Sequence, residues 1–378
     1  MKRESQLRFP GFEGAWEICS MEKISEIKKG FTPRTDNDAY WKNGDIPWLS
    51  IADMNQGKFV KNSAKNITKE ALGTKALVPK GTLIMSFKLS IGKLAILSEK
   101  MMTNEAICHF YWKNDDIITD YIYYYLNTVD ISSFGGRAVK GVTLNSDALN
   151  SIVVKLPAYS EQQKIADCLT AMDDTIEDQQ QKVEQLQSYK KGLLQQLFSQ
   201  TLRFPGFEGE WEEKKLGEVT DIRTGNNDLQ DKVDDGEYPF FVRSANIEHI
   251  DSYTYDGEAV LIPGDGNIGQ IYHYINGRFA YHQRVYKISD FVDVTGKYIY
   301  YYMNEFFKKE ALRNSVKATV DSLRLPTLTN FKVQTPSLPE QQKIADCLST
   351  LDEVIELEQQ KLEKLQVYKK GLLQQLFA

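Results

Sequence analysis

The sequence is poor in the residues from which catalytic and metal sites are usually built. Its 378 residues include only four cysteines and four histidines. Neither set shows the spacing of a zinc site, and four cysteines in a chain of this length make no disulfide framework. We therefore expect reduced, packed thiols and no bound metal.

Long apolar runs are also absent. No stretch approaches the roughly 20 apolar residues that a membrane-spanning helix requires, and residues 1–6 lead into no apolar signal core. The chain is 42% hydrophobic and 26% charged, which excludes the disordered and fibrous classes and leaves room for two or more domains. These features predict a soluble, cytoplasmic protein.

Familiar catalytic motifs are missing as well. The sequence contains no Gly-x-x-x-x-Gly-Lys-Ser/Thr, no His-Glu-x-x-His, no Gly-x-Ser-x-Gly and no Asn/Asp-Pro-Pro-Tyr/Phe motif. Gly264–Gly269 matches the dinucleotide-binding glycine pattern, but such a site needs a helix directly after the glycines. Gln270–Ile275 is instead an aromatic and β-branched run ending in Asn276-Gly277, a hairpin signal. We expect no catalytic residue and no cofactor in this chain.

The net charge of −6 argues at first against a nucleic-acid partner, because basic surfaces neutralise phosphate groups. The charge is unevenly distributed, however. Residues 1–155 carry 21 basic and 17 acidic side chains, and residues 278–332 carry 10 and 5. The acidic total therefore permits local basic surfaces.

The strongest signal is an internal repeat. Segments of the first half return in the second half at an offset of 195 residues near the start and 177–179 residues later. A unit of this size can hold its own core, so we expect two similar domains, each followed by a similar long segment, with the chain ends close together. The repeated pairs are Leu7–Gly14 and Leu202–Gly209, Tyr121–Asn127 and Tyr298–Asn304, Glu161–Leu169 and Glu340–Leu348, and Tyr189–Phe198 and Tyr368–Phe377.

Each long segment is typical of a helix. Residues 161–198 contain no proline and one glycine, and good helix formers are abundant. Apolar residues recur at coiled-coil spacing in both copies, interrupted at the same two steps by Gln179 and Lys190 and by Glu358 and Lys369. Matching halves suggest a pseudo-two-fold axis, which makes the helices antiparallel. The predicted coiled-coil seam consists of Ile165, Leu169, Met172, Ile176, Val183, Leu186, Leu193, Leu197, Ile344, Leu348, Leu351, Ile355, Leu362, Leu365, Leu372 and Leu376.

The domains that precede the helices are predicted to be mostly strand. Ala76–Leu97 and Ala259–Ile288 contain strand-like apolar runs separated by turn residues, whereas Tyr121–Asn127 and its copy are helix-like. The predicted class is α+β, with two mostly-β domains joined by two long antiparallel coiled-coil helices in pseudo-two-fold symmetry. The predicted boundaries are 1–157 and 201–337 for the two domains, and 158–200 and 338–378 for the two spacer helices.

Two variable domains and a rigid spacer without catalytic motifs favour a recognition role. Sequence-specific DNA binding needs contacts to phosphates and to base edges, for which Arg, Lys, Asn and Gln in loops are suited. The segments 135–141 and 313–319 follow the two tyrosine-rich blocks and carry two cations each. The candidate DNA-binding residues are Lys88, Ser90, Lys93, Arg137, Lys140 and Asn145 in the first domain, and Arg243, Asn267, Gln270, His282, Gln283, Arg284, Arg313, Lys317 and Arg324 in the second.

Three segments of the first domain, Ile27–Pro33, Tyr40–Ser50 and Val78–Ile84, closely resemble the target recognition domain of specificity (S) subunits of type I restriction-modification systems. Glu161–Ala166 and its copy, each preceded by Leu-Pro, resemble the start of that family's two conserved helices, so the resemblance covers nearly the whole chain. The second domain departs from the pattern at Gly225-Asn226-Asn227, which indicates a different subtype that reads a different sequence.

The resemblance implies that each target recognition domain contacts one half of a bipartite sequence in double-stranded DNA, and that the helices set the unspecified gap. It also implies two modification (methyltransferase) subunits as partners, which bring S-adenosylmethionine and methylate adenine. Restriction (translocase) subunits, where they are present, would bring ATP and Mg²⁺. The chain itself would be a non-catalytic subunit of this DNA methylation and restriction complex.

Two other functions stay open on the sequence alone. A stand-alone tandem DNA-binding regulator would bind its site without a methyltransferase partner. A tandem adaptor for carbohydrate or protein would bind without the salt dependence of phosphate contacts and would ignore duplex DNA.

Overall fold

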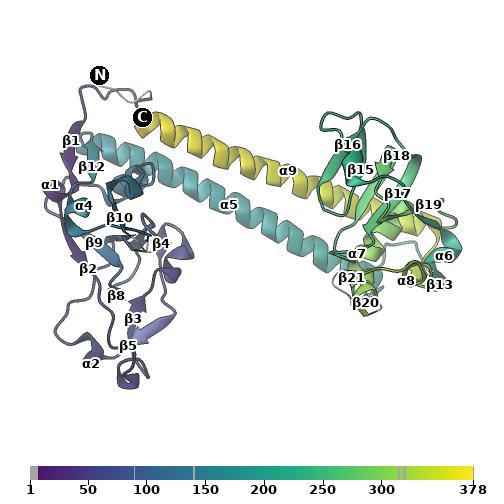
Figure 1. Cartoon of the computed structure of the whole chain (residues 1–378), viewed down its shortest axis with the longest axis horizontal. Coiled ribbons are helices and arrows are strands. Elements are labelled where there is room, and N and C mark those ends of the chain that lie inside the picture. Colours follow the sequence, from purple (N-terminus) through teal and green to yellow (C-terminus); the bar gives the residue numbers. More distant parts are fainter. Residues whose placement is uncertain (1–6, 89, 139–140, 314–315, 318–320, 378) are drawn as a thin grey trace. The chain divides into compact units, whose positions relative to one another are not determined.

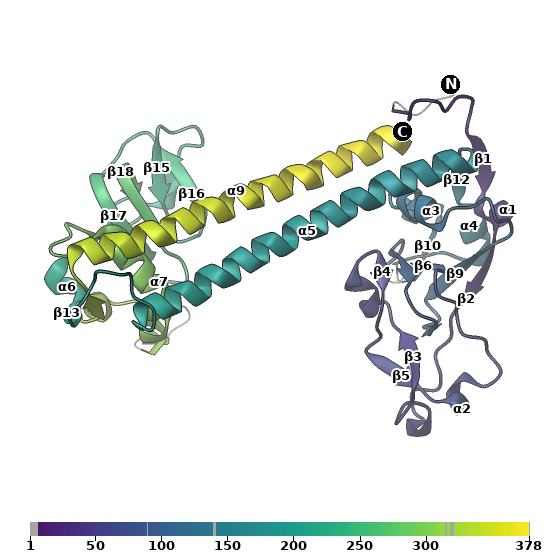
Figure 2. The same ribbon diagram turned by 180° about the vertical axis from the view of Figure 1, so that it is seen from behind.

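The computed structural model describes residues 7–88, 90–138, 141–313, 316–317 and 321–377 (Figures 1 and 2). Two compact units divide the chain: unit 1 is Met1–Gln179 with Lys361–Ala378, and unit 2 is Gln180–Gln360. Two 40-residue helices, α5 (Tyr159–Phe198) and α9 (Leu338–Phe377), each contribute to both units. Each unit therefore combines one sheet-rich domain with the first part of one long helix and the last part of the other. The four-part division expected from the sequence stays a prediction.

A five-stranded sheet of order β2-β9-β6-β7-β4 lies at the centre of unit 1. Strands β6 and β7 are buried along their whole length, because nearly all their residues are apolar and both faces of the sheet are covered. A three-stranded sheet β5-β3-β8 and the pairs β1-β12 and β10-β11 accompany it. The elements are β1 (Glu17–Ser20), α1 (Met21–Ile24), β2 (Ser25–Lys29), β3 (Ile46–Leu49), β4 (Phe59–Val60), β5 (Lys65–Ile67), α2 (Lys69–Leu72), β6 (Leu83–Ser86), β7 (Leu94–Leu97), β8 (Met102–Thr103), β9 (Ile107–Trp112), α3 (Thr119–Leu126), β10 (Gly136–Ala138), β11 (Gly141–Thr143), α4 (Ser146–Asn150) and β12 (Val153–Leu156).

Unit 2 has a six-stranded sheet of order β14-β19-β17-β18-β15-β16, with the pairs β13-β22 and β20-β21 beside it. One face of the sheet packs on α7 through a core that includes Val260, Ile288 and Tyr298. Its elements are β13 (Glu212–Lys215), α6 (Leu216–Val219), β14 (Asp221–Thr224), β15 (Tyr238–Phe241), β16 (Ile247–Ile250), β17 (Tyr255–Pro263), β18 (His273–Tyr281), β19 (Val285–Ser289), α7 (Gly296–Arg313), β20 (Val316–Lys317), β21 (Asp321–Ser322), α8 (Leu325–Thr329) and β22 (Lys332–Thr335).

The prediction of a hairpin turn at Asn276-Gly277 is wrong. Strand β18 continues through both residues, and Gly277 lies opposite Gly257 of β17. The two glycines have φ angles of +145° and +150°, which other residues rarely adopt, so they fit a locally distorted pair of strands instead of a turn. The strand that follows Gly264–Gly269 confirms the expectation that no helix begins there.

The tyrosine-rich blocks form helices, as predicted. Tyr121 of α3 and Tyr298 of α7 are fully buried, and each hydroxyl donates to a backbone carbonyl of the neighbouring strand. In unit 1 the Tyr121 ring lies 5.6 Å from the ring of Phe377 at the end of α9. In unit 2 the Tyr298 ring lies 5.5 Å from that of Phe198 at the end of α5. Each domain thus packs on the last turn of the helix that begins in the other half of the sequence.

The two long helices run antiparallel within each unit. In unit 1, Lys369 pairs with Asp173, and Ile165 shares a core with Leu372 and Leu376. In unit 2, Lys190 pairs with Asp352, and Lys182 lies 2.5 Å from Glu358. Residue numbers rise along one helix as they fall along the other, as the pseudo-two-fold prediction requires.

Most residues of the predicted seam are buried. Six members, Met172, Ile176, Leu186, Leu193, Leu351 and Leu365, are partly exposed, and the other ten are less than 10% exposed. The polar interruption Gln179, the last residue of α5 that belongs to unit 1, is 6% exposed. No helix within the described ranges is long and apolar enough to cross a membrane.

The chain ends come together in unit 1. The backbone N–H of Leu7 donates to the carbonyl of Gln375 at 3.2 Å, which confirms the expected proximity of the two termini. The repeated Leu-Arg-Phe-Pro segments also make matching contacts. Arg8 forms a two-point ion pair with buried Glu161, and Arg203 does the same with buried Glu340.

Candidate DNA interface

The same two segments lie side by side in each unit, a loop after a central strand and a short hairpin before a short helix. In unit 1 the N–H of Leu144, after the β10-β11 hairpin, donates to the carbonyl of Phe87 at 3.2 Å. In unit 2 the N–H of Leu323, after the β20-β21 hairpin, donates to the carbonyl of Gly264 at 2.8 Å. The two predicted segments with two cations each, 135–141 and 313–319, therefore overlap hairpins that lie at equivalent positions in the two units.

A tight turn with positive φ ends both loops. Gly92 has φ +81° and Gly269 has φ +64°, and each directly follows an isoleucine. A Cβ atom on Gly269 would lie 2.9 Å from the Cα of Lys308 in α7. Only glycine fits both the dihedral angle and the space, so this turn fixes the loop against the helix.

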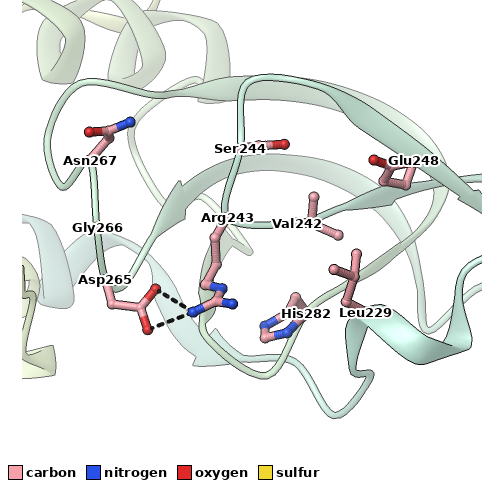
Figure 3. A pocket seen from close by; sticks show the side chains of 9 residues that line it. All are labelled: Leu229, Val242, Arg243, Ser244, Glu248, Asp265, Gly266, Asn267 and His282. Carbon is pink, nitrogen blue, oxygen red and sulfur yellow. Dashed lines mark hydrogen bonds and ion pairs between the residues drawn. The ribbon is translucent and has the colours of Figure 1, made fainter. Parts of the chain in front are cut away.

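A buried carboxylate organises the loop of unit 2 (Figure 3). Asp265 is 7% exposed and accepts from two guanidinium groups. Nη1 of Arg243 lies 3.3 Å from both carboxylate oxygens, and Nη1 of Arg284 lies 3.2 Å from Oδ2. The two arginine side chains are 49% and 63% exposed, so their outer edges face solvent. Such charge-assisted bonds orient the donors of a planar guanidinium.

His282 lies beside this pair. It is 3% exposed, and its Nδ1 accepts from the backbone N–H of Arg284 at 2.9 Å. Burial, with a smaller contribution from the Arg243 charge, lowers the pKa of His282. Gln283 is exposed and donates to Asp228 at 2.6 Å. A neutral histidine thus supports the backbone that carries two polar side chains to the surface.

Several residues of this group border a cavity of about 370 Å³. Its wall includes Asn267 from the glycine-rich loop together with Arg243, Asp265 and His282. Figure 3 shows Asn267 on the loop that continues from Asp265. The structure therefore gathers five predicted residues, which are Arg243, Asn267, His282, Gln283 and Arg284.

The other candidates of unit 2 lie apart or are engaged elsewhere. The side-chain oxygen of Gln270 accepts from Lys308 at 3.5 Å. Arg313, at the end of α7, pairs with Glu310 at 2.7 Å. Arg324 is exposed directly before α8. Lys317 lies in β20.

In unit 1 the predicted residues lie in the loop after Phe87 and in the segment from β10 to the start of α4. The ammonium group of Lys88 lies 5.5 Å from the centre of the Phe87 ring. Ser90 is exposed in the same loop, and Lys93 at its end pairs with Asn55. The Asn145 side chain caps α4 by accepting from Ala148 at 2.8 Å. Arg137 lies in β10, and Lys140 lies outside the described residues.

A group of lysines on aromatic rings in unit 1 is not among the residues predicted from the sequence. Lys29 lies 5.0 Å from the Phe87 ring centre and donates to Ser146 at 2.9 Å. Lys28 lies over Tyr111 at 5.0 Å, and Lys75 lies over Phe31 at 4.5 Å. Lys28 and Lys29 stand within the resembling segment Ile27–Pro33, which was the available signal.

These lysines line a cavity of about 460 Å³ whose wall also contains His109. Burial lowers the pKa of His109 to about 4. Its Nε2 lies 2.6 Å from the hydroxyl of Thr103. The basic character of the cavity therefore comes from the lysines, while the histidine is neutral at pH 7. Lysine ammonium groups on aromatic surfaces suit phosphate oxygens and nucleobases.

The arrangement defines a class of protein: a duplicated recognition chain with one polar loop-and-hairpin surface in each unit. Comparison with known families is consistent with this class. The family described as "Type I restriction modification DNA specificity domain" matches the chain twice, over residues 13–188 and 208–367. The chain belongs to this family and is a type I restriction-modification specificity subunit.

Individual relatives agree with the family match. The chain is 24% identical over 403 residues to the "Type I restriction enzyme MjaIX specificity subunit" of Methanocaldococcus jannaschii, covering 96% of this chain and 92% of the relative. It is 26% identical to the MjaVIII specificity subunit of the same organism, covering 95% and 91%. The fold is similar to the solved S subunit of M. genitalium, with a TM-score of 0.69, 15% identity and coverage of 100% and 99%. None of these similarities supports the regulator or adaptor alternatives.

Proposed function

We propose that this subunit directs methylation and restriction to a bipartite DNA sequence, with one half-site contacted by each unit. One observation carries the proposal: the two units repeat the same loop-and-hairpin surface but present different side chains there. Unit 1 offers lysines beside Phe87, and unit 2 offers Arg243 and Arg284 beside Asp265. A shared frame with different contacts suits two different half-sites.

In this proposal the residues have distinct roles. Lysines such as Lys29 and Lys88 neutralise phosphates and position the duplex. Arg243, Arg284, Asn267 and Gln283 read base edges, because guanidinium groups pair with guanine and amides pair with adenine. The remaining candidates, Ser90, Lys93, Arg137, Lys140, Asn145, Gln270, His282, Arg313, Lys317 and Arg324, are proposed to contact or support contacts to DNA.

The helices α5 and α9 are proposed to set the gap between the half-sites. A 40-residue helix extends roughly 60 Å at 1.5 Å per residue. The same helices are proposed to hold two modification subunits, which supply S-adenosylmethionine and transfer the methyl group to adenine. Restriction subunits, with ATP and Mg²⁺, would join that complex. This chain contributes recognition and performs no catalysis.

Mapping methylated adenines tests the proposal. DNA is exposed to the chain together with its modification subunit, and the methylated positions are sequenced. The expected result is a single bipartite motif with a constant gap. Specific binding should also weaken steeply as salt is raised, because phosphate contacts release counterions. Methylation without sequence preference, or at one contiguous motif, would contradict the proposal.

A further inference from the structure

Unit 1 contains a buried cation where α3 meets α5. The side chain of Lys58 is 9% exposed, and its ammonium group lies 2.5 Å from Asp120. The same group donates to the hydroxyls of Tyr124 at 3.0 Å and Thr170 at 2.9 Å. It also lies over the Tyr124 ring, 4.5 Å from the centre. A tyrosine-lined site at this junction thus encloses one ammonium ion.

Unit 2 repeats the frame of this site. Tyr301 and Asp352 occupy the positions of Tyr124 and Asp173, and the tyrosine hydroxyl donates to the aspartate in both units, at 2.7 Å and 2.6 Å. Each aspartate also pairs with a lysine of the other long helix: Asp352 of α9 with Lys190 of α5, and Asp173 of α5 with Lys369 of α9. Ser349 stands where unit 1 has Thr170.

The space that corresponds to the Lys58 ammonium is a cavity in unit 2. It measures about 430 Å³, and its wall includes Tyr272, Tyr274, Tyr300, Tyr301, Ser349 and Asp352. Within the described part of unit 2, Ser349 receives no bond from a lysine or arginine. Lys190 lies 5.3 Å from the Tyr301 ring centre, as Lys369 lies 5.7 Å from that of Tyr124, but no second cation among the described residues lies over Tyr301 as Lys58 does over Tyr124. The frame that holds an ammonium group in unit 1 is therefore open in unit 2.

We propose that this cavity binds a primary alkylammonium group. Tyrosine faces attract cations, most strongly where water is excluded. The exposed carboxylates of Glu353 and Glu356 add negative charge at the cavity wall. The hydroxyl of Tyr272 is buried without a hydrogen-bond partner among the described residues, and an ammonium group would supply one. The cavity is also large enough for a short alkyl chain.

Lys297 is the one lysine or arginine among the described residues of the cavity wall. It stands at the position of Asp120, and its ammonium group lies 5.8 Å from the Tyr274 ring centre. Asp352 is matched by Lys190. Besides the paired Asp352, the wall thus contains one lysine and two glutamates, and a bound ammonium ion would balance the remaining negative charge.

Titration of the full chain with n-butylammonium chloride tests the site. We expect saturable binding of one equivalent by calorimetry, with no binding of n-butanol and no heat from sodium chloride at equal ionic strength. The double change Glu353→Gln and Glu356→Gln should weaken binding about fivefold or more. Glu363→Gln is the control, because Glu363 is exposed on the same helix but lies outside the cavity; this variant should bind butylammonium as the wild type does. Absence of saturable binding, or equal binding by the glutamine variant, would overturn the proposal.

A second variant uses the occupied site as the reference. Lys58→Ala removes the resident cation of unit 1, so butylammonium should raise the thermal midpoint of this variant and bind it with two equivalents. If this variant does not fold, the wild-type titration and the glutamine variant still decide the question.

Two further binding measurements on the assembled complex test the source of the ammonium group. If a lysine of the modification subunit fills the cavity, the assembled complex should no longer bind butylammonium. If a free polyamine is the ligand, the complex should bind spermidine as the isolated chain does.

Discussion

At the scale of single residues, Asp265 shows how an acidic side chain contributes to a surface proposed to bind an anionic polymer. Burial alone would disfavour its charge, but two guanidinium groups lie within hydrogen-bonding distance. In return the carboxylate restricts the orientation of Arg243 and Arg284, whose outer edges stay accessible. Removal of this carboxylate should therefore separate specific binding from charge-driven binding.

We predict that Asp265→Asn lowers the ratio of specific to non-specific DNA affinity by about tenfold to a hundredfold. This range corresponds to losing charge-assisted hydrogen bonds of about 1.5–3 kcal/mol. Non-specific affinity should rise, because one negative charge is removed. Asp256→Asn is the matched control, since Asp256 pairs with Arg278 at 3.0 Å at an exposed site. Binding measured on target and scrambled duplexes decides: an unchanged ratio would show that Asp265 does not position the arginines.

His109 gives a prediction for stability against pH. Its pKa is about 4 in the folded protein, below the ordinary 6.5, because burial disfavours the charged ring. The unfolded chain therefore binds more protons between these values, and the free energy of unfolding should fall as pH drops from 6.5 toward 4. The largest loss from this group is about 3 kcal/mol.

Urea denaturation at pH 7 and pH 4.5 checks this prediction in wild type and His109→Gln. Glutamine keeps an acceptor for Thr103 but does not titrate. The wild type should lose more stability than the variant on acidification. Equal losses in the two proteins would mean that His109 does not control this dependence.

The sequence predicted residue types better than it predicted their partners. Arg243, His282 and Arg284 were selected because they are suited to DNA, and the structure brings them together. Asp265 was not selected, because a search for DNA-binding groups favours donors and cations. Its role depends on two residues that lie about twenty positions away on either side, and only the folded loop places them within reach.

At the scale of elements, the polar residues in the coiled-coil seam account for the register of α5 against α9. Lys190 and Lys369 form one of the two polar interruptions of the apolar pattern, at equivalent positions, and each pairs with an aspartate of the other helix. Those aspartates also accept from Tyr301 and Tyr124. A polar residue in a coiled-coil seam commonly fixes register at some cost in stability. The 3.5-residue period predicted the helices, but it did not identify the tyrosines, which come from other elements.

A double-mutant cycle tests this register pair. Asp352→Lys should destabilise unit 2, because it places two ammonium groups together, and Lys190→Asp added to it should restore part of the loss. The expected coupling free energy is about 1 kcal/mol, typical of a partly exposed pair. Thermal unfolding measures each variant. The pair of Lys182 and Glu358 should give a smaller coupling, because the Lys182 side chain is 51% exposed and that of Lys190 is 23% exposed. A coupling of zero at both pairs would assign the register to apolar packing alone.

At the scale of the whole molecule, the repeat determined what could be predicted. Duplicated segments with matching order predicted the antiparallel helices and the joined termini, because a repeated sequence must satisfy the same contacts twice. The loops differ between copies, so their conformations could not be inferred from the repeat. Asn276-Gly277 illustrates the limit: a strong local turn signal gave way to a nine-residue strand paired along β17.

The proposed spacer function makes the last prediction. Inserting four helix-forming residues after the exposed Gln180 lengthens α5 by about one turn, roughly 6 Å at 1.5 Å per residue. Since stacked base pairs rise about 3.4 Å, the methylated motif should keep both half-sites while its gap grows by about one or two base pairs. The same insertion after Asp234, in an exposed loop of unit 2, should leave the gap unchanged. Sequencing of methylated DNA reads both outcomes, and an α5 variant that methylates the original spacing as efficiently as wild type would mean that the helices do not set the gap.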